Sequence, residues 1–158
     1  MLANLLFTQA TVKHLDEIIQ VFTLSVSELT SKEYSEAQQK VWANAGINKE
    51  KWIKRLAEQY FVIAHFENQP AGFASLTTSG YVDVLYVHPS FVRKGIGLAL
   101  LNHLQTEAIK LNVLELTSDV SETAKPLFLS FGFKAMHKNE FELEGQFIHN
   151  YKMIKSIV

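Results

Sequence analysis

The middle of the chain places the tightest limit on its fold, because a strand pattern passes into a long helical pattern and then returns to a strand. The aromatic and β-branched run at residues 81–87 predicts a strand. Apolar residues recur at helical spacing from the turn Gly95-Ile96-Gly97 to about Leu111, and residues 113–117 predict the next strand. A strand, a long helix and a strand in this order form a right-handed parallel crossover.

The segments on either side of the crossover predict antiparallel strands and additional helices. Turn residues at Asn68-Gln69-Pro70 and at Ser79-Gly80 suit an antiparallel meander of the strands at residues 60–66, 71–77 and 81–87. Helices are predicted over residues 12–29, after the N-cap residues Ser35 and Asn48, and from about residue 122 to 131. The last strands are predicted near residues 133–136 and 147–154.

These elements predict an α/β fold, with a mixed and mostly antiparallel sheet around a central parallel β-α-β crossover. A parallel pair inserted into such a sheet lets the two central strands splay, and the gap exposes backbone groups to a ligand. The chain has 158 residues and no linker or low-complexity segment, so one domain over residues 1–158 is expected.

Composition excludes several classes of site and partner. Fifteen Lys and Arg against 16 Asp and Glu give a net charge of -1, so binding to nucleic acid or to an anionic membrane is not expected. The absence of cysteine excludes thiolate chemistry, and the six histidines lack metal-binding spacing, so no metal is expected. No apolar stretch could cross a membrane, and the first residues lack the basic start of a signal peptide, which favours a cytoplasmic location. Locally, Lys49, Lys51, Lys54 and Arg55 are interpreted as a solvated helix face.

The turn Gly95-Ile96-Gly97 predicts an anion site at the start of the long helix. Two glycines let the backbone curl so that consecutive N–H groups point at one spot, where the helix dipole adds positive charge. Arg93 and Lys94 lie beside this spot. A P-loop is excluded because no Gly-Lys-Ser or Gly-Lys-Thr follows, and Leu100 at the third glycine position disfavours a dinucleotide fingerprint. A glycine turn chosen only for tight packing is the remaining alternative.

Two motifs around this turn resemble those of a known family. One consists of Val87-His88-Pro89 and Val92-Arg93-Lys94-Gly95-Ile96-Gly97-Leu98-Ala99-Leu100-Leu101, and it looks like the acetyl-CoA signature of the GNAT superfamily of N-acetyltransferases. The second, residues 121–133, is similar to the family's segment that ends in Gly-Phe. The resemblance extends over residues 5–155, and it implies a GNAT-like fold with acetyl-CoA as cosubstrate.

The resemblance also implies a place for each part of CoA. The main-chain N–H groups from Val92 to Leu98 would cradle the pyrophosphate, and the pantetheine arm would lie in the splay against the strand edge at Leu85 and Val87. Backbone N–H near Leu85 would stabilise the charge that develops on the thioester oxygen. The implied CoA-binding residues are Leu85, Tyr86, Val87, Val92, Arg93, Lys94, Gly95, Ile96, Gly97, Leu98 and Phe128.

Two residues depart from the family pattern. Val92 stands where Gln or Arg is usual, but the contact from this position is made largely by backbone. Phe128 stands where many members have a tyrosine that protonates the leaving thiolate, and it cannot donate a proton. A thiol with a pKa of about 8.5 is a tolerable leaving group, so water or another side chain suffices. Phe128 is expected either to form a wall of the CoA site or to belong to the core.

The acceptor amine must lose a proton before it attacks, so a base is expected near the thioester. Strand alternation predicts Tyr81, Asp83, Leu85 and Val87 on one face, and family members often have a base or water-holding residue at positions matching Tyr81 or Asp83. Asp83 is the first candidate, and the alternative is that Asp83 is held by a hydrogen bond or simply solvated. Residues expected to line the acceptor side are Ser27, Glu28, Tyr34 and Trp42, although core or lid packing is the alternative for Tyr34 and Trp42.

The sequence therefore predicts an acetyl-CoA-dependent N-acetyltransferase that acts on a primary amine of a small molecule or peptide by direct attack. The alternative is a noncatalytic acyl-CoA binding or sensing module, because the tyrosine of many family members is missing. The identity of the amine is not predicted. Pairing of the C-terminal strands with a second copy, which would make a homodimer, is left open.

Overall fold

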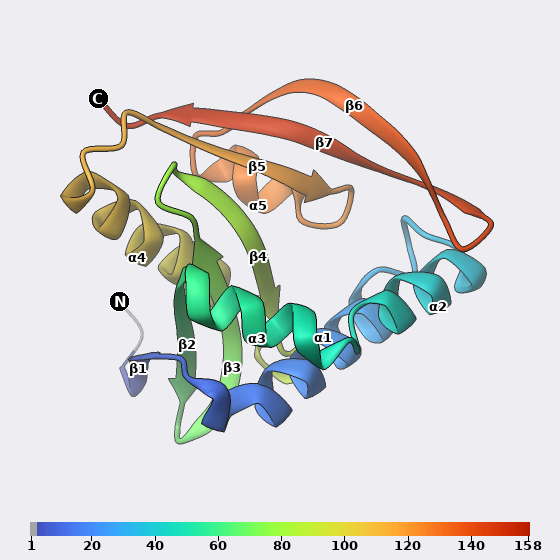
Figure 1. Cartoon of the computed structure of the whole chain (residues 1–158), viewed down its shortest axis with the longest axis horizontal. Coiled ribbons are helices and arrows are strands. Elements are labelled where there is room, and N and C mark those ends of the chain that lie inside the picture. Colours follow the sequence, from blue (N-terminus) through green and yellow to red (C-terminus); the bar gives the residue numbers. More distant parts are fainter. Residues whose placement is uncertain (1–2) are drawn as a thin grey trace.

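The computed structural model describes residues 3–158, and a seven-stranded sheet forms its centre (Figure 1). The strand order is β1-β2-β3-β4-β5-β7-β6, and neighbouring strands are antiparallel except β4 and β5. The strands are β1 (Leu5–Gln9), β2 (Tyr60–Phe66), β3 (Gln69–Leu76), β4 (Tyr81–Val87), β5 (Glu115–Ser121), β6 (Lys134–Leu143) and β7 (Gln146–Ser156). The helices are α1 (Leu15–Leu29), α2 (Glu36–Ala45), α3 (Lys49–Glu58), α4 (Ile96–Lys110) and α5 (Lys125–Ser130), with 3-10 turns η1 (Val12–His14) and η2 (Pro89–Phe91). The predicted mixed sheet with a parallel crossover is confirmed.

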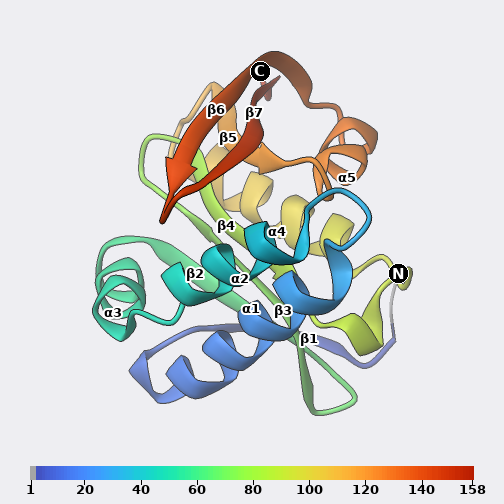
Figure 2. The ribbon, with the colours of Figure 1, turned by 90° about the vertical axis from the view of Figure 1, so that its right-hand side faces the viewer.

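Helices cover both faces of the sheet, with α4 and α5 on one side and α1, α2 and α3 on the other (Figures 1 and 2). In β2, Val62 and Ala64 are buried with α4, whereas Phe61 and Ile63 are buried with α1 and with Trp52 of α3. A strand that is covered on both faces needs apolar residues at every position, because successive side chains point in opposite directions. No helix within residues 3–158 is long and apolar enough to cross a membrane.

Strands β4 and β5 are joined over a short stretch only. Their parallel register consists of Tyr81 opposite Thr117 and Val82 opposite Ser118. The Thr117 N–H also donates to the Gly80 carbonyl at 3.0 Å. Beyond this stretch the two strands diverge (Figure 1). The predicted splay is confirmed, and it leaves one backbone edge of β4 open to a ligand.

A β-bulge in β4 changes the direction of its side chains. Ala74 of β3 lies opposite Leu85, but Leu76 lies opposite Val82, so β4 contains one extra residue in this interval. An extra residue shifts all later side chains to the other face. Accordingly, Val82 and Leu85 pack on the α4 side, whereas Val84 packs on the side of α1 and α3.

The predicted alternation along β4 is wrong for this reason. Leu85 and Val87 pack against the cluster under α4. Asp83 instead turns toward α3, where the Arg55 Nε lies 2.9 Å from its carboxylate. Tyr81, Asp83, Leu85 and Val87 therefore do not share one face.

Of the two C-terminal strands, β6 extends to Leu143, well beyond its predicted end near residue 136, whereas β7 lies close to its predicted range. They form a hairpin that turns at Glu144 and Gly145, both of which have positive φ. Nearly all of β6 is exposed, so its sequence lacks the apolar alternation that would predict a strand beyond Met136. The helix predicted from residue 122 begins later, at Lys125, after a turn.

The hairpin of β6 and β7 reaches the N-terminal half of the chain near α2 (Figure 2). The Gln38 Nε2 donates to the Phe147 carbonyl at 2.7 Å, and the Tyr34 hydroxyl donates to the His149 carbonyl at 2.9 Å. These bonds hold the hairpin over the space between β4 and β5.

Candidate active site

The turn before α4 leaves a run of backbone N–H groups without a partner. Arg93 and Gly95 have φ angles of 63° and 81°, which curl the backbone. The first hydrogen bond of the helix runs from the Ala99 N–H to the Gly95 carbonyl at 3.0 Å. In the described part of the chain, the N–H groups from Val92 to Leu98 meet no acceptor. Such donors at a helix N-terminus form an anion site.

Glycine is favoured at the two positions of the turn for different structural reasons. A Cβ on Gly95 would have nothing within 4 Å, so glycine is favoured there by the left-handed backbone. A Cβ on Gly97 would lie 2.7 Å from the Leu127 Cδ2, so glycine is favoured there by the packing of α4 on α5. The tight-packing alternative therefore applies to Gly97 and not to Gly95. Arg93 and Lys94 are exposed beside the turn.

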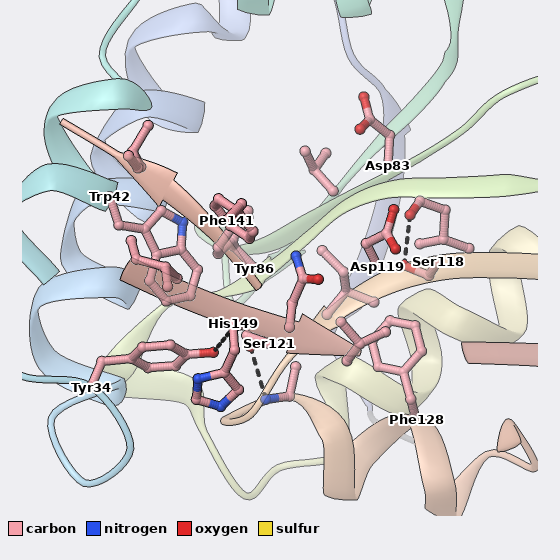
Figure 3. A pocket seen from close by; sticks show the side chains of 18 residues that line it. Tyr34, Trp42, Asp83, Tyr86, Ser118, Asp119, Ser121, Phe128, Phe141 and His149 are labelled. Carbon is pink, nitrogen blue, oxygen red and sulfur yellow. Dashed lines mark hydrogen bonds between the residues drawn. The ribbon is translucent and has the colours of Figure 1, made fainter. Parts of the chain in front are cut away.

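A pocket of about 220 Å³, here called the main pocket, opens where β4 and β5 diverge (Figure 3). The predicted site residues that it brings together are Tyr34, Trp42, Asp83, Leu85, Tyr86 and Phe128. Figure 3 shows Tyr34 and Trp42 on one side of the pocket and Phe128 on the other. Ser27 and Glu28 are exposed on α1 and do not line it.

Asp83 lines the main pocket and is held through one of its two oxygens. The Arg55 Nε and the Gln59 Nε2 donate to Asp83 Oδ2 at 2.9 and 2.8 Å. Within residues 3–158, Oδ1 has no hydrogen-bond donor. The side chain is 22% exposed, so this oxygen is accessible. Asp83 is therefore a carboxylate of fixed orientation with one free oxygen, and Figure 3 shows it turned away from Tyr34, His149 and Phe128.

Comparison with known proteins identifies the family. A family model of the acetyltransferase (GNAT) domain matches residues 30–155. The chain belongs to the GNAT acetyltransferase family. It is 33% identical over 138 residues to the uncharacterized N-acetyltransferase YafP of Escherichia coli (strain K12), a match that covers 87% of this chain and 86% of that protein.

Solved GNAT structures have the same fold. The GCN5-related N-acetyltransferase from Rhodopseudomonas palustris, also named aminotransferase class-II, matches with a TM-score of 0.94 and 32% identity over 99% of this chain and 98% of its own. The PaiA N-acetyltransferase from Thermoplasma acidophilum, solved in complex with coenzyme A, has a TM-score of 0.80 and 20% identity over 98% of this chain and 99% of its own. The predicted family and fold class are confirmed.

In this GNAT protein, Phe128 both lines the main pocket and belongs to the buried core. Its ring packs edge-on against Phe133 with the centroids 5.0 Å apart, and the residue is 3% exposed. The core alternative is therefore confirmed, and the role of Phe128 as a wall of the CoA site stays a prediction. The side chain has no hydrogen-bonding group, so position 128 supplies no proton.

Tyr81 and Asp119 form a hydrogen-bonded pair across β4 and β5. The Tyr81 hydroxyl donates to Asp119 Oδ2 at 2.7 Å, and the Asn139 Nδ2 donates to Oδ1 at 3.0 Å. Burial, together with the bond to Asp119, raises the pKa of the Tyr81 hydroxyl. Tyr81 therefore stays protonated near neutral pH, where it donates a hydrogen bond and does not accept a proton. Sequence reasoning missed Asp119, which lines the main pocket, because the predicted strand ended at residue 117.

A second group that sequence reasoning missed closes the pocket beside β7. The His149 Nε2 lies 3.0 Å from Glu122 Oε1, which also accepts a hydrogen bond from the Tyr151 hydroxyl at 2.9 Å. These hydrogen bonds lower the pKa of the Glu122 carboxyl. The Tyr34 ring stacks on His149 at 5.4 Å, and its hydroxyl accepts a hydrogen bond from the Glu122 N–H at 2.9 Å. No local motif marks this cluster, because its members lie far apart in the chain.

Proposed function

We propose that the protein transfers the acetyl group of acetyl-CoA to a primary amine of a small molecule or peptide. The observation that carries this proposal is the run of free N–H groups from Val92 to Leu98, next to the splay of β4 and β5. Gly97 lies against Leu127 of α5, and the neighbouring Phe128 lines the main pocket. An anion at the turn and an extended chain in the splay would therefore belong to one ligand, as the pyrophosphate and pantetheine of CoA do.

The donor site is proposed to consist mainly of backbone. The N–H groups from Val92 to Leu98 would hold the pyrophosphate, and Arg93 and Lys94 would add charge for phosphate groups. The edge of β4 around Leu85, which has no partner strand there, would pair with the pantetheine amides. The CoA complex of PaiA, which has the same fold, supports this choice of donor. Acetyl-CoA supplies a thioester whose carbonyl carbon accepts the amine.

Asp83 is the proposed proton acceptor because the residue lines the main pocket and one of its carboxylate oxygens meets no donor among residues 3–158. Oδ1 takes one proton from the acceptor ammonium, directly or through a water. The amine lone pair then forms the C–N bond at the thioester carbonyl carbon, while the Leu85 N–H donates to the carbonyl oxygen. The C–S bond breaks, the nitrogen releases its second proton to water, and the thiolate takes up a proton from water because Phe128 has none to give.

Two measurements test this function. We expect CoA to raise the melting temperature, since a ligand at ~100 times its Kd adds about 2.7 kcal/mol of stability. We also expect at least one member of an amine library to release thiol from acetyl-CoA faster than buffer does, with the N-acetyl product seen by mass spectrometry. Unchanged melting at millimolar CoA would contradict the proposed donor. A rise in melting temperature with CoA, without turnover on any amine, would favour the noncatalytic module. The observation that favours this alternative is Phe128, which cannot donate a proton.

A further inference from the structure

A second pocket of about 170 Å³, here called the side pocket, adjoins the main pocket. The two pockets share Trp42, Val84 and Tyr86 as walls. The other walls of the side pocket are Lys51, Trp52 and Arg55 of α3, Phe22 of α1, and Ala45 and Gly46 at the end of α2. The side pocket, which has aromatic walls and two cationic groups, therefore lies next to the main pocket.

Lys51 and Arg55, one helical turn apart on α3, give the side pocket a positive charge. The Arg55 Nε is bonded to Asp83, and the guanidinium lies 4.8 Å from the centroid of the Trp52 ring. Among residues 3–158, the two terminal nitrogens of Arg55 meet no acceptor, and Lys51 has no carboxylate partner. Donors of both cations are therefore free at this pocket.

The main pocket has the opposite charge. Its lining residues include Asp83 and Asp119, and no described Lys or Arg lines it. The ion pair of Arg55 and Asp83, at 2.9 Å, connects the side pocket with the main pocket. Free donors on one member and a free oxygen on the other suit a ligand whose ammonium and anionic groups lie a few bonds apart.

We propose that the acceptor is a small amine with a carboxylate close to its amino group, as in an α-amino acid with an apolar side chain. This proposal rests on the proposed acetyl transfer, because the amino group must reach Asp83. The carboxylate binds Arg55, whose planar fork matches it, and Lys51. The apolar part packs against Trp42 and Tyr86. An alkylamine without a carboxylate leaves Lys51 and the terminal nitrogens of Arg55 without a partner, so it binds more weakly.

Tryptophan fluorescence tests this binding without turnover, because Trp42 and Trp52 line the side pocket and the chain has two tryptophans. In the presence of CoA, the protein is titrated with L-leucine, L-valine and L-methionine, each beside the amine that lacks its carboxylate. We expect at least one amino acid to bind ~10-fold more tightly than its amine. The proposal is overturned if no amino acid binds more tightly than its amine. It is also overturned if the matching α-aminophosphonate binds more tightly than the amino acid.

Two lysine variants separate a local contact from general charge. Lys51→Gln should weaken amino-acid binding about two- to fivefold. Lys54→Gln removes the same charge from an exposed position of α3 outside both pockets, and it should leave the amino-acid affinity unchanged within experimental error. Equal losses in the two variants would overturn the contact to Lys51. The melting shift with CoA is recorded throughout: its absence from the parent protein contradicts the proposed function, whereas a shift without a preference for carboxylates overturns only the acceptor class.

Discussion

The two sides of the candidate active site use different parts of the polypeptide. On the proposed CoA side, the binding groups are backbone N–H groups of one continuous segment, from Val92 to Leu98. The side chains of Val92 and Leu98 themselves are exposed. On the proposed acceptor side, the groups are side chains from several elements, such as Arg55 of α3, Asp83 of β4 and His149 of β7. The first kind of site depends on a few φ angles, and the second depends on the packing of the whole chain.

This difference has a consequence for how each side responds to substitution. Most side-chain changes in a backbone site leave the binding groups in place, so the φ angle at Gly95 matters more than the identity of Val92. In a site made of side chains, a single replacement removes the binding group itself. The four predictions below use this contrast, from the largest expected effect to the smallest.

Replacing the proposed base should have the largest effect. Asp83→Asn keeps the size and the hydrogen bonds to Arg55 and Gln59 but cannot accept the ammonium proton, so turnover at neutral pH should fall by ~10² to 10⁴. Turnover should recover partly at higher pH, where more of the amine is already deprotonated. CoA affinity should not change, because it depends on backbone groups.

The comparison variant is Asp119→Asn, measured with the same acceptor from pH 6 to 9. Asp119 lines the same pocket but accepts hydrogen bonds through both oxygens. Turnover of Asp83→Asn within threefold of the parent, together with a large loss in Asp119→Asn, would move the base to β5.

Two glycines with nearly equal positive φ angles test the donor side. Gly95 and Gly145 have φ angles of 81° and 83°, and a Cβ at either would have nothing within 4 Å. Alanine at either position should cost about 1–2 kcal/mol of stability. Only Gly95→Ala should weaken CoA, by ~10-fold or more, because relaxing this φ angle turns the N–H groups away from the anion. Calorimetric titration with CoA decides this, and equal affinities in the two variants would argue against the turn as the pyrophosphate site.

Restoring the hydroxyl of the family pattern should have a smaller effect. Phe128→Tyr keeps the ring and adds one donor at the pocket wall, so CoA affinity should stay within a few fold and turnover should be preserved or raised. Initial rates and melting temperatures measure both effects. Loss of folding, or a fall in stability of about 1–3 kcal/mol without a gain in rate, would show that the hydroxyl is sealed in the core without a partner.

The smallest expected effect is a pH dependence of stability at the acceptor side. Hydrogen bonds from His149 and Tyr151 lower the pKa of the Glu122 carboxyl below its ordinary value of 4.5. The stabilisation is therefore complete above about pH 4.5 and is lost as the pH falls through the lower pKa of the folded state. Glu122→Gln should flatten the fall in melting temperature below pH 4.5. Glu142→Gln, exposed on β6, is the control, and identical slopes in the two variants would exclude the effect.

The backbone geometry of the proposed CoA side was predictable because its information is local. A strand, a turn with Gly95 and a long helix follow one another in the sequence, and apolar spacing of the helix gives their order. The central crossover and the splay follow from this order alone. The curled turn was also predictable, since the left-handed conformation at Gly95 requires no contact with the rest of the chain.

The acceptor side was less predictable because it depends on long-range register. No residue pattern in the sequence predicts the bulge in β4. Strand alternation therefore placed Asp83 on the same face of the sheet as Leu85, although the two side chains lie on different faces. Asp119 and His149 come from parts of β5 and β7 whose pairing decides where their side chains point. Ser27 and Glu28 illustrate the opposite error, since they were expected to line the acceptor side. Both are exposed on α1 and do not line the main pocket.

The hydroxyl of Tyr34 bears on the order in which the molecule is assembled. Its partners, the Glu122 N–H and the His149 carbonyl, lie 88 and 115 residues further along the chain. The strand that contains His149 lies inside the sheet, between β5 and β6, although it is the last to be synthesised. During synthesis, the glycine turn and α4 can therefore fold before β7 exists. The Tyr34 hydroxyl cannot form its hydrogen bond to β7 until the end of the chain is made. The two sides of the site thus differ in when they form as well as in the groups that compose them. The side proposed to bind the amine is completed last.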